Sequence, residues 1–247
     1  MNALKSAYIN EIYKISKKKK LIVAAALSVG AVIVCGLIFS GINYIAGIKV
    51  SGGANFAISV LPFLQHTIIA LFTAFVCIDM FSGEFGDKTI KLALTRPVSR
   101  FKIYLAKALA GATFIIAFLI FSLMCAIIVS LFTDGIETSI FKPTAAYILS
   151  FFPLMVFALL VMFVSNFSRG SASAFLISIV LFLAFKGAEF MTPAYKSFFF
   201  TSSFDWYKLF FGAYVNIFKI VRILLIFLGY MVFLFTCGYA LFEKRNF

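Results

Sequence analysis

The sequence predicts an all-α polytopic membrane protein with six transmembrane helices, and three observations support this fold class. Of the 247 residues, 63% are hydrophobic and 13% are charged, whereas a soluble domain has about 25% charged residues. The apolar residues gather into runs of roughly 20, the length that a helix needs to cross the hydrocarbon core of a bilayer. These runs do not alternate between apolar and polar residues, so they do not fit the strands of an outer-membrane barrel.

The composition also excludes several classes of protein. A soluble chain of this length cannot cover so much apolar surface with polar groups, which excludes a soluble enzyme, a nucleic-acid-binding domain and a disordered protein. The net charge of +13 comes from basic residues between the apolar runs, so we assign it to anionic lipid headgroups and expect no nucleic-acid partner. No metal site is expected, because the chain has one histidine and its cysteines lie singly inside apolar runs: Cys35, Cys77, Cys125 and Cys237.

Residues 1–20 are expected to form a helix that lies in the headgroup layer. Leu4, Tyr8, Ile12 and Ile15 recur on one helical face, and lysines flank that face. Such a helix presents its apolar stripe to the acyl chains and its lysines to anionic membrane lipids. The alternative is a solvated basic tail, which needs no apolar stripe.

Six transmembrane helices follow, because a backbone in hydrocarbon must satisfy its own hydrogen bonds. The first is expected to be retained, since its apolar run is longer than the core of a cleavable signal peptide. The whole chain, 1–247, is expected to form a single transmembrane domain. Its predicted spans are 21–45, 58–80, 104–132, 145–164, 172–185 and 223–242.

The distribution of basic residues predicts the orientation of the chain. Placing the N-terminus inside puts most of the 22 basic residues on the inner side of the membrane, as the positive-inside rule requires. The two short outer loops then carry one lysine each, Lys49 and Lys142. Six spans return the chain to the side on which it started, so both termini are expected to be cytoplasmic.

The connection between the fifth and sixth spans, 186–222, is rich in aromatic residues, unlike a fully solvated loop. We interpret it as one or two short helices that dip into the outer leaflet of the membrane. Trp206, Tyr207 and Tyr214 are expected near the membrane interface, where aromatic side chains with a polar end concentrate.

The inner connection, 81–103, predicts a short amphipathic cytoplasmic helix between the second and third spans. Glu84 and Asp87 stand where carboxylates complement the positive end of a helix, and Lys88–Leu94 supplies about two turns. Pro97 ends this helix. Such an element can transmit motion from a soluble partner to two membrane helices. The alternative is an ordinary basic loop that follows the positive-inside rule.

Two stretches of this connection resemble the signature of ABC-2-type transporter permeases: Glu84-Phe85-Gly86-Asp87-Lys88-Thr89 and Leu94-Thr95-Arg96-Pro97-Val98-Ser99-Arg100. The C-terminal ending, 240–247, is similar to the aromatic and basic tag with which such permeases often finish. The predicted layout resembles that family too, since it combines an interfacial N-terminal helix, six spans and a membrane-dipping outer segment.

The resemblance implies a permease subunit of an ATP-driven ABC exporter in a bacterial cell membrane, similar to bacitracin-resistance and lantibiotic-immunity permeases. It implies two copies of a separate ABC ATP-binding subunit and a second permease, identical or homologous. ATP and Mg are then expected in the partner subunit, and this chain is expected to carry no cofactor and no enzymatic activity. The implied substrate is a drug, an antimicrobial peptide or a lipid-like molecule, moved by alternating access.

In that family the connection between the second and third spans couples the permease to the ATPase. The resemblance therefore implies a set of coupling residues at matching positions of this chain: Glu84, Asp87, Lys88, Thr89, Lys91, Leu94, Thr95, Arg96 and Pro97. Within this stretch, Gly86-Asp87-Lys88-Thr89 also faintly resembles the end of a phosphate-binding loop. That loop needs Gly immediately before Lys, where this chain has Asp87, so nucleotide binding is assigned to the partner.

Gln65 and His66 form the most polar pair at membrane depth. An interhelical hydrogen bond is the simpler interpretation, because polar side chains commonly join helices within a membrane bundle. The alternative is a substrate contact or a proton relay, since polar residues at that depth also line transport pathways.

Two other functions stay open from the sequence alone. A secondary transporter or channel would need several buried ionisable groups along a pathway, and the middles of these spans contain almost none beyond His66. A membrane scaffold or sensor that recruits a partner without transporting anything is harder to separate from a permease. A neighbouring gene for an ATP-binding subunit would distinguish the two.

Overall fold

A computed structural model describes residues 3–46, 56–86, 98–133, 140–168, 170–191, 198–211 and 215–245. Within these ranges the chain is helical and has no β-strand. Six helical stretches are long and apolar enough to cross a membrane, which confirms the predicted all-α fold with six transmembrane helices: Lys19–Ile42, Phe56–Gly83, Arg100–Phe132, Phe141–Phe167, Ser171–Glu189 and Ile217–Lys244.

The N-terminal region forms two helices, α1 (Ala3–Ser16) and α2 (Lys19–Ala46). Both pack against α7 (Arg100–Thr133). On α1, Ile15 is buried and Ile12 packs against the core. The predicted apolar stripe therefore contacts the helical bundle along part of its length, while the placement of α1 in the headgroup layer stays a prediction.

The second span is one helical stretch built from segments of two kinds. Two of them, η1 and η2, are π-helical and therefore wider than the α-helical segments beside them. The five segments, in chain order, are α3 (Phe56–Leu64), η1 (Gln65–Ile69), α4 (Ala70–Ile78), η2 (Asp79–Gly83) and α5 (Glu84–Gly86).

The fourth span lies at the centre of the bundle and consists of α8 (Phe141–Leu149) and α9 (Phe151–Phe167). Most of the residues of α9 are buried. The helix contacts α4, α7, α10 (Ser171–Met191) and α11 (Ile217–Lys244). A helix that is apolar on all sides belongs in the interior of a bundle, and the sequence of α9 satisfies this condition.

The described part of the connection before the sixth span includes the short 3₁₀ helices η4 (Phe200–Ser203) and η5 (Trp206–Phe210). Trp206 is buried against the bundle and its indole Nε1 donates a hydrogen bond to the Leu149 carbonyl oxygen, 2.9 Å away. These short helices therefore pack onto the transmembrane helices. Tyr214 lies outside the described residues.

The helices extend beyond all six predicted spans, and local contacts explain two of these extensions. The fifth span, predicted at 172–185, continues to the end of α10 because Lys186 and Glu189 lie one turn apart with Nζ and Oε2 separated by 3.8 Å, so their charges partly compensate inside the helix. The sixth begins early because the Asn216 side chain accepts a hydrogen bond from the backbone N–H of Lys219 at 3.1 Å and caps the helix.

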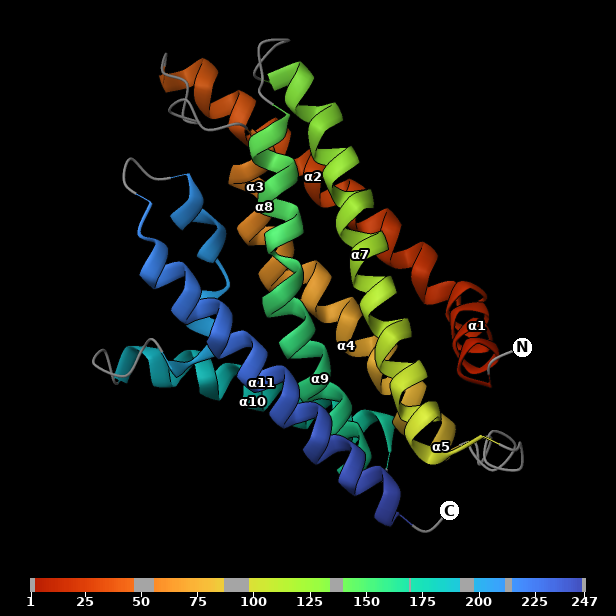
Figure 1. Ribbon diagram of the computed structural model, residues 1–247. Coiled ribbons are helices and arrows are strands. Elements are labelled where there is room, and N and C mark those ends of the chain that lie inside the picture. Colours follow the sequence, from red (N-terminus) through yellow and green to blue (C-terminus); the bar gives the residue numbers. More distant parts are fainter. Residues whose placement is uncertain are drawn as a thin grey trace.

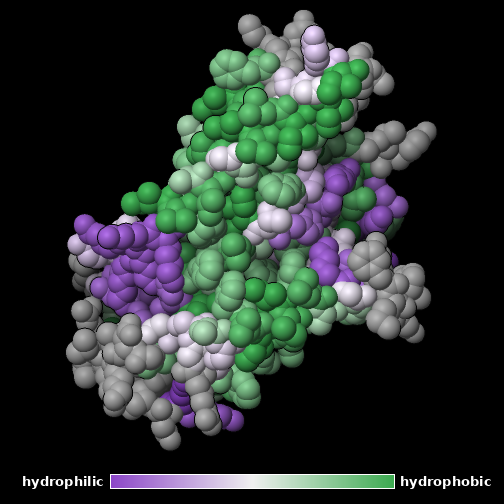
Figure 2. All heavy atoms as spheres, turned by 180° about the vertical axis from the view of Figure 1, so that it is seen from behind, coloured by the Kyte–Doolittle hydropathy of each residue, from purple (hydrophilic) through white to green (hydrophobic). Residues whose placement is uncertain are grey.

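The surface of the molecule matches a membrane environment. Hydrophobic residues cover much of the face in Figure 2, and hydrophilic residues gather in separate patches. The most exposed spans are α2, α10 and α11, whose outward side chains are large and apolar. In Figure 1 both termini and α5 lie toward the lower end of the bundle. We call this end, formed by α1, α5, the start of α7 and the end of α11, the base.

Candidate coupling site

A buried lysine occupies the base of the bundle. Lys107 lies two turns into α7 and is completely buried. Its Nζ atom is 2.8 Å from Glu84 Oε2 and 3.1 Å from Glu11 Oε2, and it donates to the Met80 carbonyl oxygen at 2.7 Å. Three elements, α1, the end of the second span and α7, therefore meet at one ammonium group.

A second lysine completes the arrangement. Lys14 lies one turn after Glu11 on α1, and its Nζ atom is 2.9 Å from Glu11 Oε1 and 2.7 Å from Glu84 Oε1. Each lysine thus bonds both carboxylates, and each carboxylate bonds both lysines. We call these four residues, Glu11, Lys14, Glu84 and Lys107, the charge ring. Two positive and two negative groups compensate one another, which is the condition under which buried charges are tolerated.

The charge ring shifts the pKa of two of its members. Burial by itself would raise the pKa of the Glu84 carboxyl, but Lys107 and Lys14 overcome this effect and lower it. Burial would lower the pKa of the Lys14 ammonium, but Glu11 and Glu84 overcome this effect and raise it. Both shifts favour the charged forms of Glu84 and Lys14 around neutral pH.

We expect the detergent-solubilised chain to lose stability at both extremes of pH. The stability due to Glu84 is present above the ordinary carboxyl pKa of 4.5 and is lost as the pH falls through its lowered pKa, because protonation removes one partner of two lysines. The stability due to Lys14 is present below the ordinary pKa of 10.5 and is lost as the pH rises through its raised pKa. The unfolding temperature, measured against pH, tests both limits. An unfolding temperature that stays constant on the acid side would contradict the role of Glu84.

A more exposed ion pair lies beside the charge ring. Asp79 Oδ2 is 3.2 Å from Lys18 Nζ and 3.0 Å from Lys20 Nζ, which connects the start of α2 to the second span. The lysine side chains are 33% and 54% exposed, so these contacts contribute less to stability than the buried ring does.

Arg245, at the end of α11, joins this helix to the other elements of the base. The Arg245 guanidinium lies over the Phe85 ring, 4.0 Å from its centroid, and donates hydrogen bonds to the carbonyl oxygens of Asn166 and Ser168 at the end of α9. Arg100, the first residue of α7, donates to the carbonyl oxygen of Arg245 at 3.3 Å. The sixth span is therefore joined to both flanks of the segment 87–97.

The structure describes one of the nine predicted coupling residues, Glu84. The other eight lie outside the described residues: Asp87, Lys88, Thr89, Lys91, Leu94, Thr95, Arg96 and Pro97. They belong to the segment 87–97, whose two neighbours in the chain, α5 and the start of α7, are both anchored at the base. Sequence reasoning did not identify Lys14 and Lys107 as the partners of Glu84, or Glu11 as the second carboxylate that they bond. The available signal was Lys107, a lysine inside the apolar span predicted at 104–132, because such a charge needs a buried partner.

Gln65 and His66 lie far from the base. Gln65 is completely buried and its Nε2 atom donates to the carbonyl oxygen of Phe204 at 2.9 Å. His66 Nδ1 is 2.8 Å from the Pro62 carbonyl oxygen, and since a carbonyl only accepts, Nδ1 carries the proton. The two side chains therefore bond backbone groups of the chain itself.

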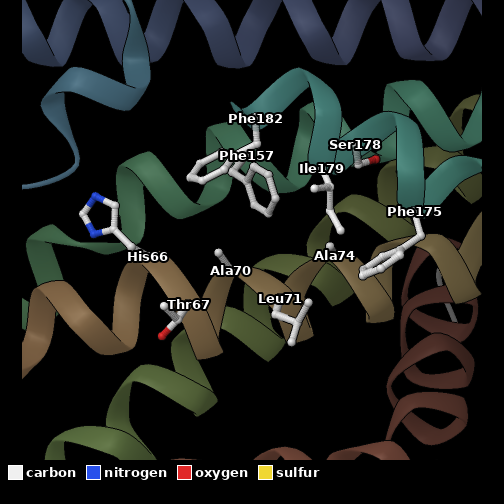
Figure 3. A pocket seen from close by; sticks show the side chains of 10 residues that line it. All are labelled: His66, Thr67, Ala70, Leu71, Ala74, Phe157, Phe175, Ser178, Ile179 and Phe182. Atoms are coloured by element: carbon white, nitrogen blue, oxygen red, sulfur yellow. The ribbon is translucent and has the colours of Figure 1, made fainter. Parts of the chain in front are cut away.

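His66 also lines a groove of about 100 Å³ between the second span and α9 and α10. In Figure 3 the side chains of Phe157, Ile179 and Phe182 point toward the α4 segment from the opposite wall. The lining is mostly apolar and comprises His66, Thr67, Ala70, Leu71, Ala74, Phe157, Phe175, Ser178, Ile179 and Phe182. Among the described residues, no group of three or more His, Cys, Asp or Glu side chains is placed to hold a metal ion.

Six apolar helical spans, of which the fourth is buried at the centre of the bundle, define a multi-pass membrane protein. The sequence matches the family described as ABC-2 family transporter protein over residues 9–185. This match covers more than half of the chain, so the chain belongs to the ABC-2 transporter family and is a membrane permease component of an ABC transporter. The family implies association with an ABC ATP-binding subunit. None of the curated proteins matches the chain.

Proposed function

We propose that the chain is the permease of a bacterial ABC exporter. In this proposal the charge ring transmits the ATP-driven motion of the ATP-binding subunits to the transmembrane helices. The substrate class is a drug, an antimicrobial peptide or a lipid-like molecule. Two ATP-binding subunits and a second permease, identical or homologous, complete the transporter. ATP and Mg belong to the ATP-binding subunits, and transport follows alternating access between the two permeases.

The observation that carries this proposal is that the charge ring holds α5, the element that directly precedes the segment 87–97 in the chain. Glu84 precedes this segment and is held by Lys14 and Lys107 at 2.7 and 2.8 Å. Arg100 follows the segment and bonds the end of α11. A force on the segment therefore reaches α1, the second span, the third span and the sixth span together, because charge-assisted hydrogen bonds connect them.

The residues Asp87, Lys88, Thr89, Lys91, Leu94, Thr95, Arg96 and Pro97 would contact the ATP-binding subunit, with Glu84 joining them to the ring. ATP binding would bring the two ATP-binding subunits together. Their movement would displace the segment, and the charge ring would pass that displacement to the spans as a rigid-body motion.

The proposal includes an orientation. The base, with both termini, lies on the cytoplasmic side of the bacterial cell membrane, and the lysines of α1 and of the start of α2 face its anionic headgroups. Support comes from the excess of basic residues on this side and from the need for a soluble ATP-binding subunit to reach the base from the cytoplasm.

Simultaneous replacement of Thr95, Arg96 and Pro97 by alanine tests the coupling assignment. We expect co-purification with the ATP-binding subunit to weaken about tenfold or more, as for the loss of a strong interface contact, and ATP turnover of the complex to fall with it. The control variant Lys142→Ala, at the end of the bundle away from the base, should leave both unchanged. Unaltered co-purification and turnover in the triple variant would reject the assignment.

A further inference from the structure

The second span contains two π-helical segments, Gln65–Ile69 and Asp79–Gly83. The other five spans have no such segment within their described residues. A π-helical turn accommodates one residue more than an α-helical turn and occurs mostly as a single wide turn, frequently at a functional site. The two wide turns isolate the α4 segment between them.

Local chemistry explains the first wide turn. Pro62 lies one turn earlier and lacks a backbone N–H group. His66 Nδ1 and Thr67 Oγ1 donate to the carbonyl oxygens of Pro62 and Phe63, so side chains compete with backbone N–H groups for these acceptors. Such back-bonding and proline are recognised causes of a local break in helical regularity.

Both ends of the second span are fixed to their surroundings. Toward the far end, Gln65 bonds the carbonyl oxygen of Phe204, and the Tyr147 hydroxyl bonds that of Ala57 at 3.3 Å. Toward the base, the Ser82 hydroxyl donates to the Ser165 carbonyl oxygen at 3.0 Å, and the charge ring holds α5. A displacement of α4 can therefore be taken up at the wide turns.

The groove lies alongside α4. Ala70, Leu71 and Ala74 form its wall on the second span, and side chains of α9 and α10 form the opposite wall (Figure 3). Because two of these three residues are alanines, this face of α4 leaves space beside α10 that a rotation of α4 would fill. The wide turn at Gln65–Ile69 and the groove share His66 and Thr67.

We infer that α4 is a movable section of the second span, which turns about its axis at the two π-helical joints and thereby opens or closes the groove against α10. In this motion α4 shifts by one residue relative to the fixed ends of the second span, so that the first π-helical joint loses one residue and the second gains one. In an α-helix this step is a rotation of about 100° and a rise of about 1.5 Å. The contribution of this motion to transport rests on the proposed function, whereas the motion itself does not.

Distance measurements between spin labels test the inference with the full chain in lipid nanodiscs, after replacement of the four native cysteines by alanine. One label replaces Leu71 on α4 and the other replaces Val180 on α10, both of them exposed positions. We expect two distance populations in this background. Deletion of Thr67 removes the extra residue of the first joint while the flanking α-helical register is kept, so one of the populations should be lost.

Two controls make the result specific. Labels at Phe63 and Ile148, exposed positions on α3 and α8, should give a single distance that the deletion does not change. The double variant His66→Leu/Thr67→Val removes the side-chain hydrogen bonds to Pro62 and Phe63 without shortening the chain. It should also deplete one of the two distance populations. This variant provides the test if the deletion variant does not fold. A single Leu71–Val180 distance that neither variant alters would overturn the inference. Co-purification with the ATP-binding subunit is a separate readout that reports on the proposed function.

Discussion

Replacing Lys107 by methionine is expected to destabilise the detergent-solubilised chain by about 3–5 kcal/mol, the cost of removing one partner from a buried ion pair. The variant leaves Glu84 and Glu11 with one lysine between them, and Lys14 is 38% exposed, so it shares its charge with solvent. Methionine fills a volume similar to that of lysine, so the loss of stability measures the removal of the charge and not a change in packing. The temperature of unfolding in detergent, followed by the fluorescence of Trp206, measures the effect.

Two further variants separate the charge ring from a general sensitivity of α7. Lys102→Met changes an exposed lysine of the same helix and should alter stability by less than about 0.5 kcal/mol, as expected for a surface substitution. The triple variant Glu11→Gln/Glu84→Gln/Lys107→Met removes the unpaired buried charges and should recover a large part of the lost stability. Equal unfolding temperatures for Lys107→Met and Lys102→Met would show that the ring does not stabilise the fold.

The number of spans could be predicted from the sequence because lipid imposes a simple rule. A run of apolar residues long enough to cross the bilayer must be helical, and each of the six helices coincides with such a run. Interruptions inside a span do not follow from this rule. The break at Ser150 and the wide turns at Gln65–Ile69 and Asp79–Gly83 depend on side-chain bonds and on packing between helices, to which apolar periodicity is insensitive.

The candidate site was only partly predictable for a related reason. Glu84 stands within a recognisable stretch next to the end of a span, so the sequence itself directs attention to it. The other ring residues lie 73 and 70 residues earlier and 23 residues later, at Glu11, Lys14 and Lys107. A lysine inside an apolar span signals that a buried carboxylate exists. That Glu11 is one of the carboxylates bonded by Lys107 depends on the packing of α1 against α7. No local sequence pattern predicts this contact.

Replacing Gly238 by alanine is expected to destabilise the chain by about 1–3 kcal/mol, the usual cost of overpacking a core. An added Cβ atom would overlap the Tyr104 hydroxyl oxygen and lie 3.2 Å from its Cζ atom. Tyr104 is completely buried, with its ring centroid 5.5, 5.1 and 5.7 Å from those of Phe81, Phe235 and Phe242. The ring cannot move aside among these neighbours, so α11 must shift away from α7.

The Tyr104 hydroxyl provides the matched test of this explanation. It is buried, and no described group forms a hydrogen bond with it, so Tyr104→Phe should be neutral or slightly stabilising. The double variant Tyr104→Phe/Gly238→Ala should regain most of the stability that Gly238→Ala loses, because the overlapping atom is gone. Gly229→Ala, on the same helix with no atom within 4 Å of the added Cβ, should stabilise by up to about 1 kcal/mol through helix propensity. If both alanine variants unfolded at the wild-type temperature, close contact between α7 and α11 at Gly238 would be disproved.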